Sequence, residues 1–312
     1  MIESIKYGLR LVQMVKDNRA RRGPLRVDIA VTSACNYNCL FCNWHSPLIE
    51  NTSTPDKLDR TVLCDLFRGL AKLGTKYLLF SGNGEPLLYR DLLSQIPVES
   101  FDIEIVTNGS LLEKIGALAF AKLKRVTVSL NSGTGASHPK THGYAGTNRF
   151  DHTLWHIRRL AAIDPDKVRL NYVVTVDNYT EIPYFISKCE ALGVKYALRH
   201  VSVDRPEFQQ LSIAPSLSTH DDKLRPCYNG YIQPYVAANG NVLVCPGSGN
   251  IPMGNLNRDT FEQIWQAPSS IELRRNASRM HKTGQALCIS CRGCPLPKLH
   301  SAQFHKFFRW IA

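Results

Sequence analysis

Short apolar runs alternate with amphipathic segments along the first two thirds of the chain. Six runs predict strands over residues 26–32, 77–80, 103–106, 125–130, 168–175 and 195–201. Apolar residues spaced three and four apart predict helices over residues 55–73, 111–121, 150–162 and 180–192, with a Gly- and His-rich loop over 131–148. Because strands and helices alternate, the pattern predicts an α/β fold in which parallel strands form a partial (β/α)6 barrel.

The pattern changes after residue 203. We expect an N-terminal helix over 1–24, the barrel over 25–203, a polar linker over 204–226, a small domain over 227–296 and an aromatic, basic tail over 297–312. In the small domain, Asn239-Gly240 predicts the turn of a β-hairpin, and residues 260–276 predict a helix. The second domain is therefore expected to be a hairpin followed by a helix.

Composition narrows the class of protein. The chain has 312 residues, of which 44% are hydrophobic and 21% are charged. No apolar run approaches the roughly 18–20 residues of a membrane span, and the first residues lack the pattern of a signal peptide. We therefore expect no membrane span and a cytoplasmic location, where ten cysteines indicate metal or redox chemistry rather than disulfides.

The formal net charge of +12 favours an anionic partner, although solvated surface lysines account for it equally well. No run of five like charges and no RNA-binding signature occurs, so no nucleic-acid partner is expected. A phosphorylated small molecule and a membrane surface remain the anionic partners that this charge suits.

Three cysteines follow the first predicted strand with the spacing C-x3-C-x2-C, at Cys35, Cys39 and Cys42. Thiolates suit iron–sulfur clusters, zinc or copper. Three ligands on a [4Fe-4S] cluster would leave one iron open to another molecule. Other polar loops follow later strands at the same end of the sheet, where α/β barrels place their chemistry.

This stretch resembles the signature of the radical SAM superfamily. Residues 82–86, Gly-Asn-Gly-Glu-Pro, resemble the GGEP motif of that family, from which Asn83 departs. The resemblance covers about residues 25–296. It implies that Cys35, Cys39 and Cys42 hold a [4Fe-4S] cluster, and that S-adenosylmethionine (SAM) binds its open iron. It also implies an external one-electron reductant of the flavodoxin or ferredoxin type, and a 5′-deoxyadenosyl radical that removes hydrogen from the substrate.

The resemblance also implies which residues contact SAM. Phe41 is placed to pack against the adenine, and the Glu85 carboxylate suits the methionyl ammonium. Arg199 would pair with the cofactor carboxylate or a substrate anion, unless it is a plain surface arginine. The complete expected set is Phe41, Gly82, Asn83, Gly84, Glu85, Pro86, Asn108, Ser129 and Arg199. Weaker acid–base candidates are His45, His138, His142 and His200.

A second cysteine group comprises Cys227, Cys245, Cys288, Cys291 and Cys294. It resembles the twitch/SPASM extensions of the superfamily, which hold an auxiliary [4Fe-4S] cluster; a zinc ribbon is the alternative. One cluster needs four thiolates, so one of the last three is expected to be surplus. A surplus thiol would return a hydrogen atom to the substrate in an epimerase. Without one, the cluster would accept a second electron in a dehydrogenase.

The expected function is therefore a radical SAM oxidoreductase or epimerase acting on a small polar substrate: a sugar, aminocyclitol, aminoglycoside or nucleotide derivative. About 25 residues precede the first strand, too few for a leader-binding domain. A peptide maturase with a separate leader-binding protein is one alternative. A non-catalytic electron-transfer protein is another, but it would need no motif for SAM.

Overall fold

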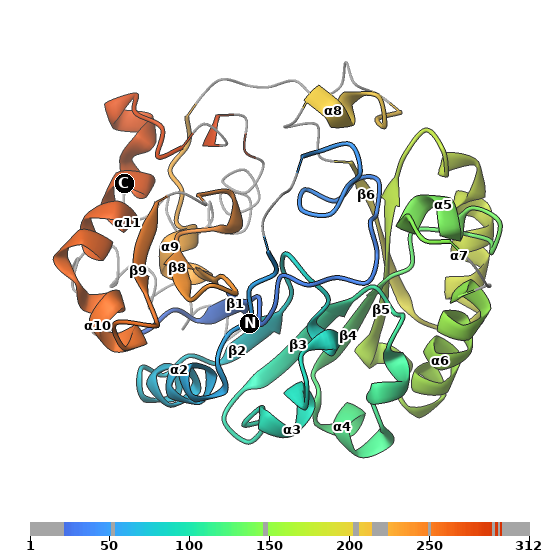
Figure 1. Cartoon of the computed structure of the whole chain (residues 1–312), viewed down its shortest axis with the longest axis horizontal. Helices are drawn as coiled ribbons and strands as arrows, with labels where there is room; N and C mark the ends of the chain where they lie inside the picture. Colours follow the sequence, from blue (N-terminus) through green and yellow to red (C-terminus); the bar gives the residue numbers. More distant parts are fainter. Residues whose placement is uncertain are drawn as a thin grey trace, which may run out of the picture. The chain divides into compact units, whose positions relative to one another are not determined.

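The computed structural model describes residues 22–50, 54–145, 149–201, 206–213, 224–248, 251–288, 291, 292 and 294 (Figure 1). The predicted N-terminal helix up to residue 21, most of the linker over 204–226, and the tail over 297–312 lie outside these residues. The chain divides into two compact units. One contains Met1–Ile29, Leu58–Leu78 and Thr219–Ala312, and the other contains Ala30–Lys57 and Leu79–Ser218.

The second of these units is built on parallel strands. β3 (Asp102–Thr107), β4 (Arg125–Ser129), β5 (Val168–Val174) and β6 (Lys195–His200) pair side by side in this order. β2 (Tyr77–Phe80) is divided between the two units. Side chains on β3 and β5 alternate between buried and more exposed positions, as expected for strands whose one face lies in a core.

Strand register brings the carboxyl ends of neighbouring strands to one edge. Thr107 pairs with Val128, and Ser129 pairs with Asn171. The loops that follow these strands therefore emerge close together, which is the arrangement that the sequence predicts.

Helices and 3-10 turns connect the strands of this unit. They are η1 (Pro86–Leu88), α3 (Leu92–Gln95), η2 (Leu112–Lys114), α4 (Ala117–Lys122), α5 (His138–His142), α6 (Arg149–Ile163), η3 (Pro165–Lys167), η4 (Tyr179–Glu181), α7 (Ile182–Ala191) and α8 (Pro206–Gln209). Two predictions were wrong in detail. The helix expected over 111–121 is broken at Gly116, whose extended backbone (φ −66°, ψ 163°) begins α4. The loop expected over 131–148 contains α5.

The first unit holds the antiparallel strands. β1 (Arg26–Ile29) pairs in parallel with β7 (Tyr235–Val236), which continues antiparallel through β8 (Asn241–Leu243) and β9 (Pro252–Asn255). The predicted turn is present, since Gly240 has φ 86° and its N–H bonds the Ala237 carbonyl. The third strand, β9, was not predicted.

Helices α2 (Arg60–Lys72), α9 (Asn229–Ile232), α10 (Phe261–Gln266) and α11 (Pro268–Thr283), with η6 (Pro246–Ser248), complete this unit. The helix predicted over 260–276 is two helices, because Ala267 takes an extended ψ of 139° before Pro268. The overall prediction is confirmed: parallel strands alternate with helices, and a hairpin with helices follows at the C-terminal end.

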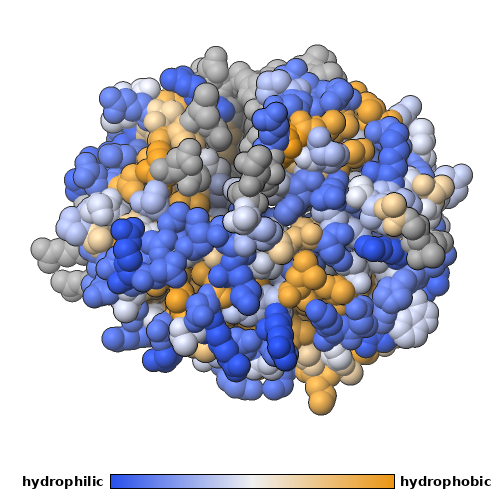
Figure 2. Space-filling model, viewed as in Figure 1, coloured by the Kyte–Doolittle hydropathy of each residue, from blue (hydrophilic) through white to orange (hydrophobic). Residues whose placement is uncertain are grey.

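Apolar side chains are concentrated in the interior of each unit. Ile105, Val126 and Leu170 are 0% exposed in one, and Val27, Leu63 and Val242 are 0% exposed in the other. Polar residues cover most of the face seen in Figure 2, with hydrophobic residues in small patches. Among the described helices, none is long and apolar enough to cross a membrane.

Candidate functional site: an iron–sulfur and cofactor centre

Cys35, Cys39 and Cys42 lie on an irregular loop that follows β1, and each thiol is half-buried. Burial raises the pKa of Cys35 to about 11, and the negative charges of Glu85 and Cys42 raise it further. Burial, followed by the charges of Cys42 and Cys35, also raises the pKa of Cys39 well above its ordinary value. The three sulfurs therefore lie within electrostatic reach of one another, where a cationic metal centre would hold them as thiolates.

The donor set bears on the metals that the sequence left open. Three half-buried thiols on one loop can supply one thiolate to each of three irons of a cubane cluster, which leaves the fourth iron open. The triad therefore fits a cluster.

Backbone and amide donors surround two of the sulfurs. The N–H groups of Trp44 and His45 each lie 3.4 Å from Cys42 Sγ. Asn108 Nδ2 lies 3.8 Å from Cys35 Sγ. Donors aimed at sulfur stabilise the thiolate form and tune a bound cluster. The spacing of the cysteines gave no indication of these contacts.

The Gly82–Pro86 loop lies directly on the cysteine loop. A β-carbon on Gly84 would stand 2.4 Å from the Ala34 carbonyl oxygen, so only glycine permits this approach. Glu85 N–H donates to the same carbonyl at 2.9 Å. His45 Nε2 donates to the Asn83 carbonyl at 2.7 Å, a second link between the two loops. The two sequence motifs thus form one structural unit.

The carboxylate of Glu85 is buried and connects the loop after β2 to the end of β3. Oε1 accepts hydrogen bonds from Leu87 N at 3.0 Å and Thr107 Oγ1 at 2.8 Å, and Oε2 accepts one from Asn108 N at 2.7 Å. Burial raises its pKa, opposed by these hydrogen bonds and the charge of Lys114. These contacts position Asn108, while the expected contact of Glu85 with the methionyl ammonium stays a prediction.

Asn108 reaches back to the cysteine loop. Its Nδ2 donates to Asn36 Oδ1 at 2.9 Å, and its Oδ1 accepts from Ser110 N at 2.9 Å. Asn36 Nδ2 closes the ring by donating to Ser110 Oγ at 2.8 Å. These hydrogen bonds therefore hold together the loops after β1, β2 and β3.

The remaining predicted cofactor residues lie at or near this edge of the unit. Phe41 is half-buried and packs against the cluster of Val201, Phe208 and Leu211. Ser129 is half-buried at the end of β4, and Pro86 begins η1 and is buried. Arg199 is exposed on β6. Their contacts with SAM stay predictions.

Two of the candidate acid–base histidines belong to the interior. His138 and His142 on α5 are both 0% exposed. Burial lowers the pKa of His138 to about 2 and that of His142 to about 4, so both rings are neutral near neutral pH. His142 Nε2 donates to the Leu130 carbonyl at 3.0 Å, and its Nδ1 lies 3.2 Å from Cys39 Sγ. His142 therefore supports a ligand loop, a role that the sequence did not indicate.

The second cysteine group is also brought together. Cys288 Sγ and Cys291 Sγ are 3.4 Å apart. Burial raises the pKa of Cys227 to about 12, and the charges of Cys245, Cys294 and Cys288 contribute further. Burial likewise raises the pKa of Cys291 to about 12, with contributions from Cys288 and Cys245. All five thiols thus belong to one electrostatically coupled group, and the choice of a surplus thiol stays a prediction.

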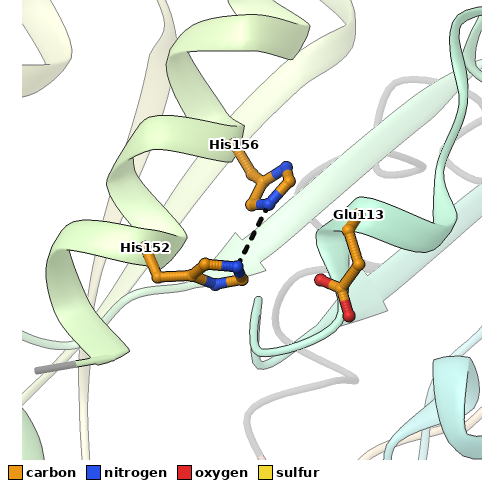
Figure 3. A group of neighbouring side chains, drawn as sticks. All are labelled: Glu113, His152 and His156. Atoms are coloured by element: carbon orange, nitrogen blue, oxygen red, sulfur yellow. Dashed lines mark hydrogen bonds between the residues drawn. The ribbon is translucent and has the colours of Figure 1, made fainter. Parts of the chain in front are cut away.

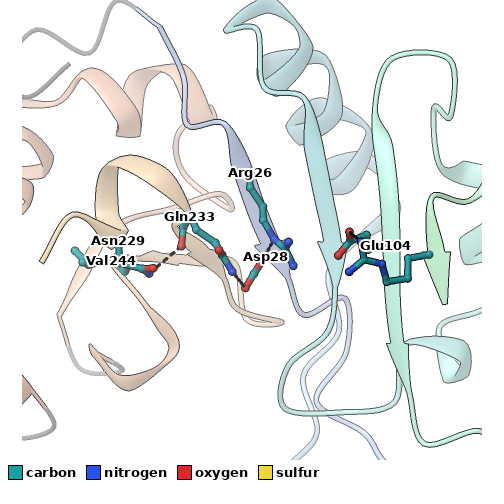
Figure 4. Close-up of polar contacts among 7 residues, drawn as sticks. Arg26, Asp28, Glu104, Asn229, Gln233 and Val244 are labelled. Carbon is teal, nitrogen blue, oxygen red and sulfur yellow. Dashed lines mark hydrogen bonds and ion pairs between the residues drawn. The ribbon is translucent and has the colours of Figure 1, made fainter. Parts of the chain in front are cut away.

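One buried amide holds two of these ligand segments in place (Figure 4). Asn229 Nδ2 donates to the carbonyls of Val244 and Gln233, both at 2.9 Å. Because Asn229 follows Cys227 closely and Val244 precedes Cys245, the amide fixes the separation of the two cysteines. Gln233 Nε2 in turn donates to Asp28 Oδ2 at 2.6 Å, which ties this group to β1.

Comparison with known proteins agrees with this geometry. The family model of the radical SAM superfamily matches residues 29–186, and that of SPASM, an iron–sulfur cluster-binding domain, matches residues 227–295.

The relatives of this chain include proteins named GTP 3′,8-cyclase. The probable GTP 3′,8-cyclase of Saccharolobus solfataricus is 27% identical over 248 residues, covering 72% of this chain and 77% of that protein. The GTP 3′,8-cyclase of Chlorobaculum tepidum is 34% identical over 182 residues, covering 56% and 52%.

Among solved structures, Streptococcus suis SuiB bound to the precursor peptide SuiA aligns with a TM-score of 0.62. The identity is 16%, and the alignment covers 85% of this chain and 70% of that one. At this identity the likeness concerns the fold.

Proposed function

Since this chain belongs to the radical SAM superfamily, we propose that it removes a hydrogen atom from a carbon of a small polar substrate, and that this substrate is a nucleotide derivative. Its cofactors are a [4Fe-4S] cluster, SAM and an auxiliary iron–sulfur cluster. When bound, the first two supply a 5′-deoxyadenosyl radical.

The observation that carries the proposal is the packing of the Gly82–Pro86 loop on the cysteine loop. Gly84 touches the backbone beside Cys35, and Glu85 holds Asn108 toward the same loop. A protein that only carried electrons would need the thiolates but not the Gly82–Pro86 loop packed against them. The role of the Gly82–Pro86 loop is to bind and orient SAM beside the open iron, through backbone groups that glycine leaves accessible.

The substrate class is supported by charge and by relatives. The net charge of +12 favours an anionic ligand such as a phosphorylated nucleotide. Relatives at 25–35% identity include proteins named GTP 3′,8-cyclase or probable GTP 3′,8-cyclase. A peptide substrate is the second candidate, because SuiB shares the fold and is solved with a peptide.

The outcome of the reaction depends on the second cysteine group. A thiol of Cys288, Cys291 or Cys294 that is not a ligand would return a hydrogen atom and give an epimerase. If all are committed to the cluster, the cluster would take an electron and give a dehydrogenase. An external reductant of the flavodoxin or ferredoxin type would supply the first electron.

The test is carried out with anaerobically reconstituted protein, dithionite and SAM. The products are measured with GTP, with ATP, with an unphosphorylated aminoglycoside, and with a short peptide. We expect 5′-deoxyadenosine formation to rise only with a nucleotide, and deuterium to pass from labelled nucleotide into 5′-deoxyadenosine. Stimulation by the peptide alone would replace the nucleotide proposal.

Controls separate cluster loss from substrate choice. Cys35→Ala should abolish 5′-deoxyadenosine formation, whereas Cys64→Ala on α2, outside both cysteine groups, should leave it intact. Protein that carries its full complement of iron but never cleaves SAM would refute catalysis. Reactions in D2O distinguish the outcomes, because an epimerase with an exchangeable thiol incorporates deuterium and a dehydrogenase yields an oxidised product without it.

A further inference from the structure

Three side chains outside the cysteine groups converge on one point. His152 and His156 lie one turn apart on α6, and Glu113 lies on η2 (Figure 3). Their nitrogen and oxygen ligand atoms all lie within 4.8 Å of one another. His156 is buried, whereas His152 and Glu113 are exposed, so the group opens to solvent on one side.

The spacing of the two imidazoles matches a shared metal ion. His152 Nε2 and His156 Nε2 face each other at 3.3 Å. Two nitrogens bound tetrahedrally to zinc at about 2.0–2.1 Å stand about 3.3–3.4 Å apart. Residues four apart on a helix project from the same face, which is how one helix supplies two ligands to one ion.

The chemistry of the donors also suits an ion. Without a metal ion, one of these two Nε2 atoms must carry a proton and the other must accept it. If both nitrogens carried a proton, or neither did, they would repel each other at this distance. His156 Nδ1 is buried and has no partner among the described residues, so it is available to hold the proton when Nε2 binds a metal.

We propose that Glu113, His152 and His156 form a binding site for a borderline divalent cation, Zn²⁺ above all. Two imidazole nitrogens and one carboxylate oxygen are a ligand set that zinc accepts, with water in the fourth position. The site is separate from the thiolates, which prefer softer metals and clusters.

An ion at this site would tie α6 to the segment that follows Asn108. Two ties already exist: Thr153 Oγ1 lies 3.4 Å from the Gly109 carbonyl, and Arg159 donates to the Leu112 and Ile115 carbonyls at 3.0 and 2.8 Å. A third tie, with Glu113 on one side and α6 on the other, would stiffen the loop that contains Asn108. The ion would thus stabilise the Asn108 loop beside the cofactor site without touching the cofactor.

The test uses reconstituted holoenzyme, in which the clusters occupy the thiolates. Co²⁺ serves as the probe, because its visible spectrum separates nitrogen and oxygen ligation from thiolate ligation. We expect one Co²⁺ per chain without thiolate charge-transfer bands, displaced by Zn²⁺. In His152→Gln/His156→Gln the affinity should fall by more than about 100-fold, since even loss of an outer partner costs 10–100-fold. His281→Gln, which removes an exposed histidine on α11, should bind Co²⁺ normally.

A second measurement guards against misfolding. Both variants should retain the iron content and circular dichroism of the wild type, and Zn²⁺ should raise the unfolding midpoint of wild type and His281→Gln only. Equal Co²⁺ binding by the double variant overturns the site, as does a spectrum with thiolate bands alone. Should the double variant lose its iron, Glu113→Gln, which keeps the side-chain shape, decides the matter: unchanged affinity there also overturns the site.

Discussion

Replacing Gly84 with alanine tests whether the Gly82–Pro86 loop must touch the cysteine loop for SAM to bind. The new β-carbon would lie 2.4 Å from the Ala34 carbonyl oxygen and 2.5 Å from that of Thr32. An ordinary contact begins about 1 Å farther out. The obstructing atoms belong to the backbone, so no side chain can rotate away, and one loop must move off the other.

The cost of Gly84→Ala follows from these contacts. Overpacking of this kind costs about 1–3 kcal/mol. The displaced Ala34 carbonyl also accepts the hydrogen bond from Glu85 N–H at 2.9 Å, and its loss costs about 0.5–1.5 kcal/mol. Together these predict a destabilisation of roughly 2–4 kcal/mol. If SAM binds only when the two loops are in contact, a comparable penalty on that contact would weaken SAM binding by about 30- to 1,000-fold.

The assay combines denaturant unfolding with equilibrium binding of SAM to anaerobically reconstituted protein. Gly116→Ala is the matched control, because a β-carbon there meets nothing within 4 Å and φ is −66°. We expect Gly116→Ala to resemble the wild type in both measurements. If Gly84→Ala binds SAM as tightly as this control and unfolds at the same midpoint, the contact between the loops is not required and the reasoning fails.

Three further substitutions test the polar contacts of buried or half-buried side chains. Glu85→Gln turns an acceptor into a donor against a buried N–H or hydroxyl group and should cost roughly 2–3 kcal/mol in denaturant unfolding, with weaker SAM binding. Asn229→Ala leaves the carbonyls of Val244 and Gln233 without donors, so it should cost roughly 2–4 kcal/mol and lower the iron content of the auxiliary cluster. The pKa of Glu181 is lowered, because donors from residues 133–137 outweigh its burial. Its stabilisation is therefore present above the pKa of an unfolded glutamate and is lost as pH falls, so Glu181→Gln should destabilise at pH 7 and much less in acid.

Matched variants decide these outcomes. Glu99→Gln and Glu190→Gln change exposed carboxylates, and Asn257→Ala removes an exposed amide that donates to the Asn239 carbonyl at 3.0 Å. All three should leave stability within about 0.5 kcal/mol of the wild type. A Glu85 or Asn229 variant no worse than its control contradicts the role assigned to that side chain. For Glu181→Gln, a deficit that is the same at neutral and acid pH contradicts the charge-based explanation.

Local patterns predicted the strands well because each strand carries its own signal. β2 has the predicted bounds, and β4, β5 and β6 each end one residue earlier than predicted. β3 extends one residue farther at each end, and β1 ends three residues earlier than predicted. Helix ends were harder, because a single backbone angle decides them. Gly116 and Ala267 interrupt predicted helices although the apolar spacing continues across both.

The cofactor centre likewise has one part that the sequence predicted and another part that it could not predict. The spacing of Cys35, Cys39 and Cys42 predicted a metal centre, because ligands that are close in sequence form a local motif. The contact of His142 with Cys39 spans 103 positions, and that of Asn108 with Cys35 spans 73. Such contacts depend on which loops the fold brings together, so they carry no local signature. For the same reason the pairing of Glu113 with His152 and His156 could not be read from the sequence.

β6 has a consequence for the behaviour of the protein in solution. It stands first in the strand order of the sheet, pairs with β5 among the described strands, and has five exposed residues of six. Such a strand offers unpaired backbone groups to any other extended chain, which makes it a template for aggregation. Lys195 and Arg199 supply positive charge along it, so two copies would bring like charges together on pairing. Neutralising Lys195 and Arg199 should therefore promote self-association, most strongly at low salt, where the charges now repel over the longest distance.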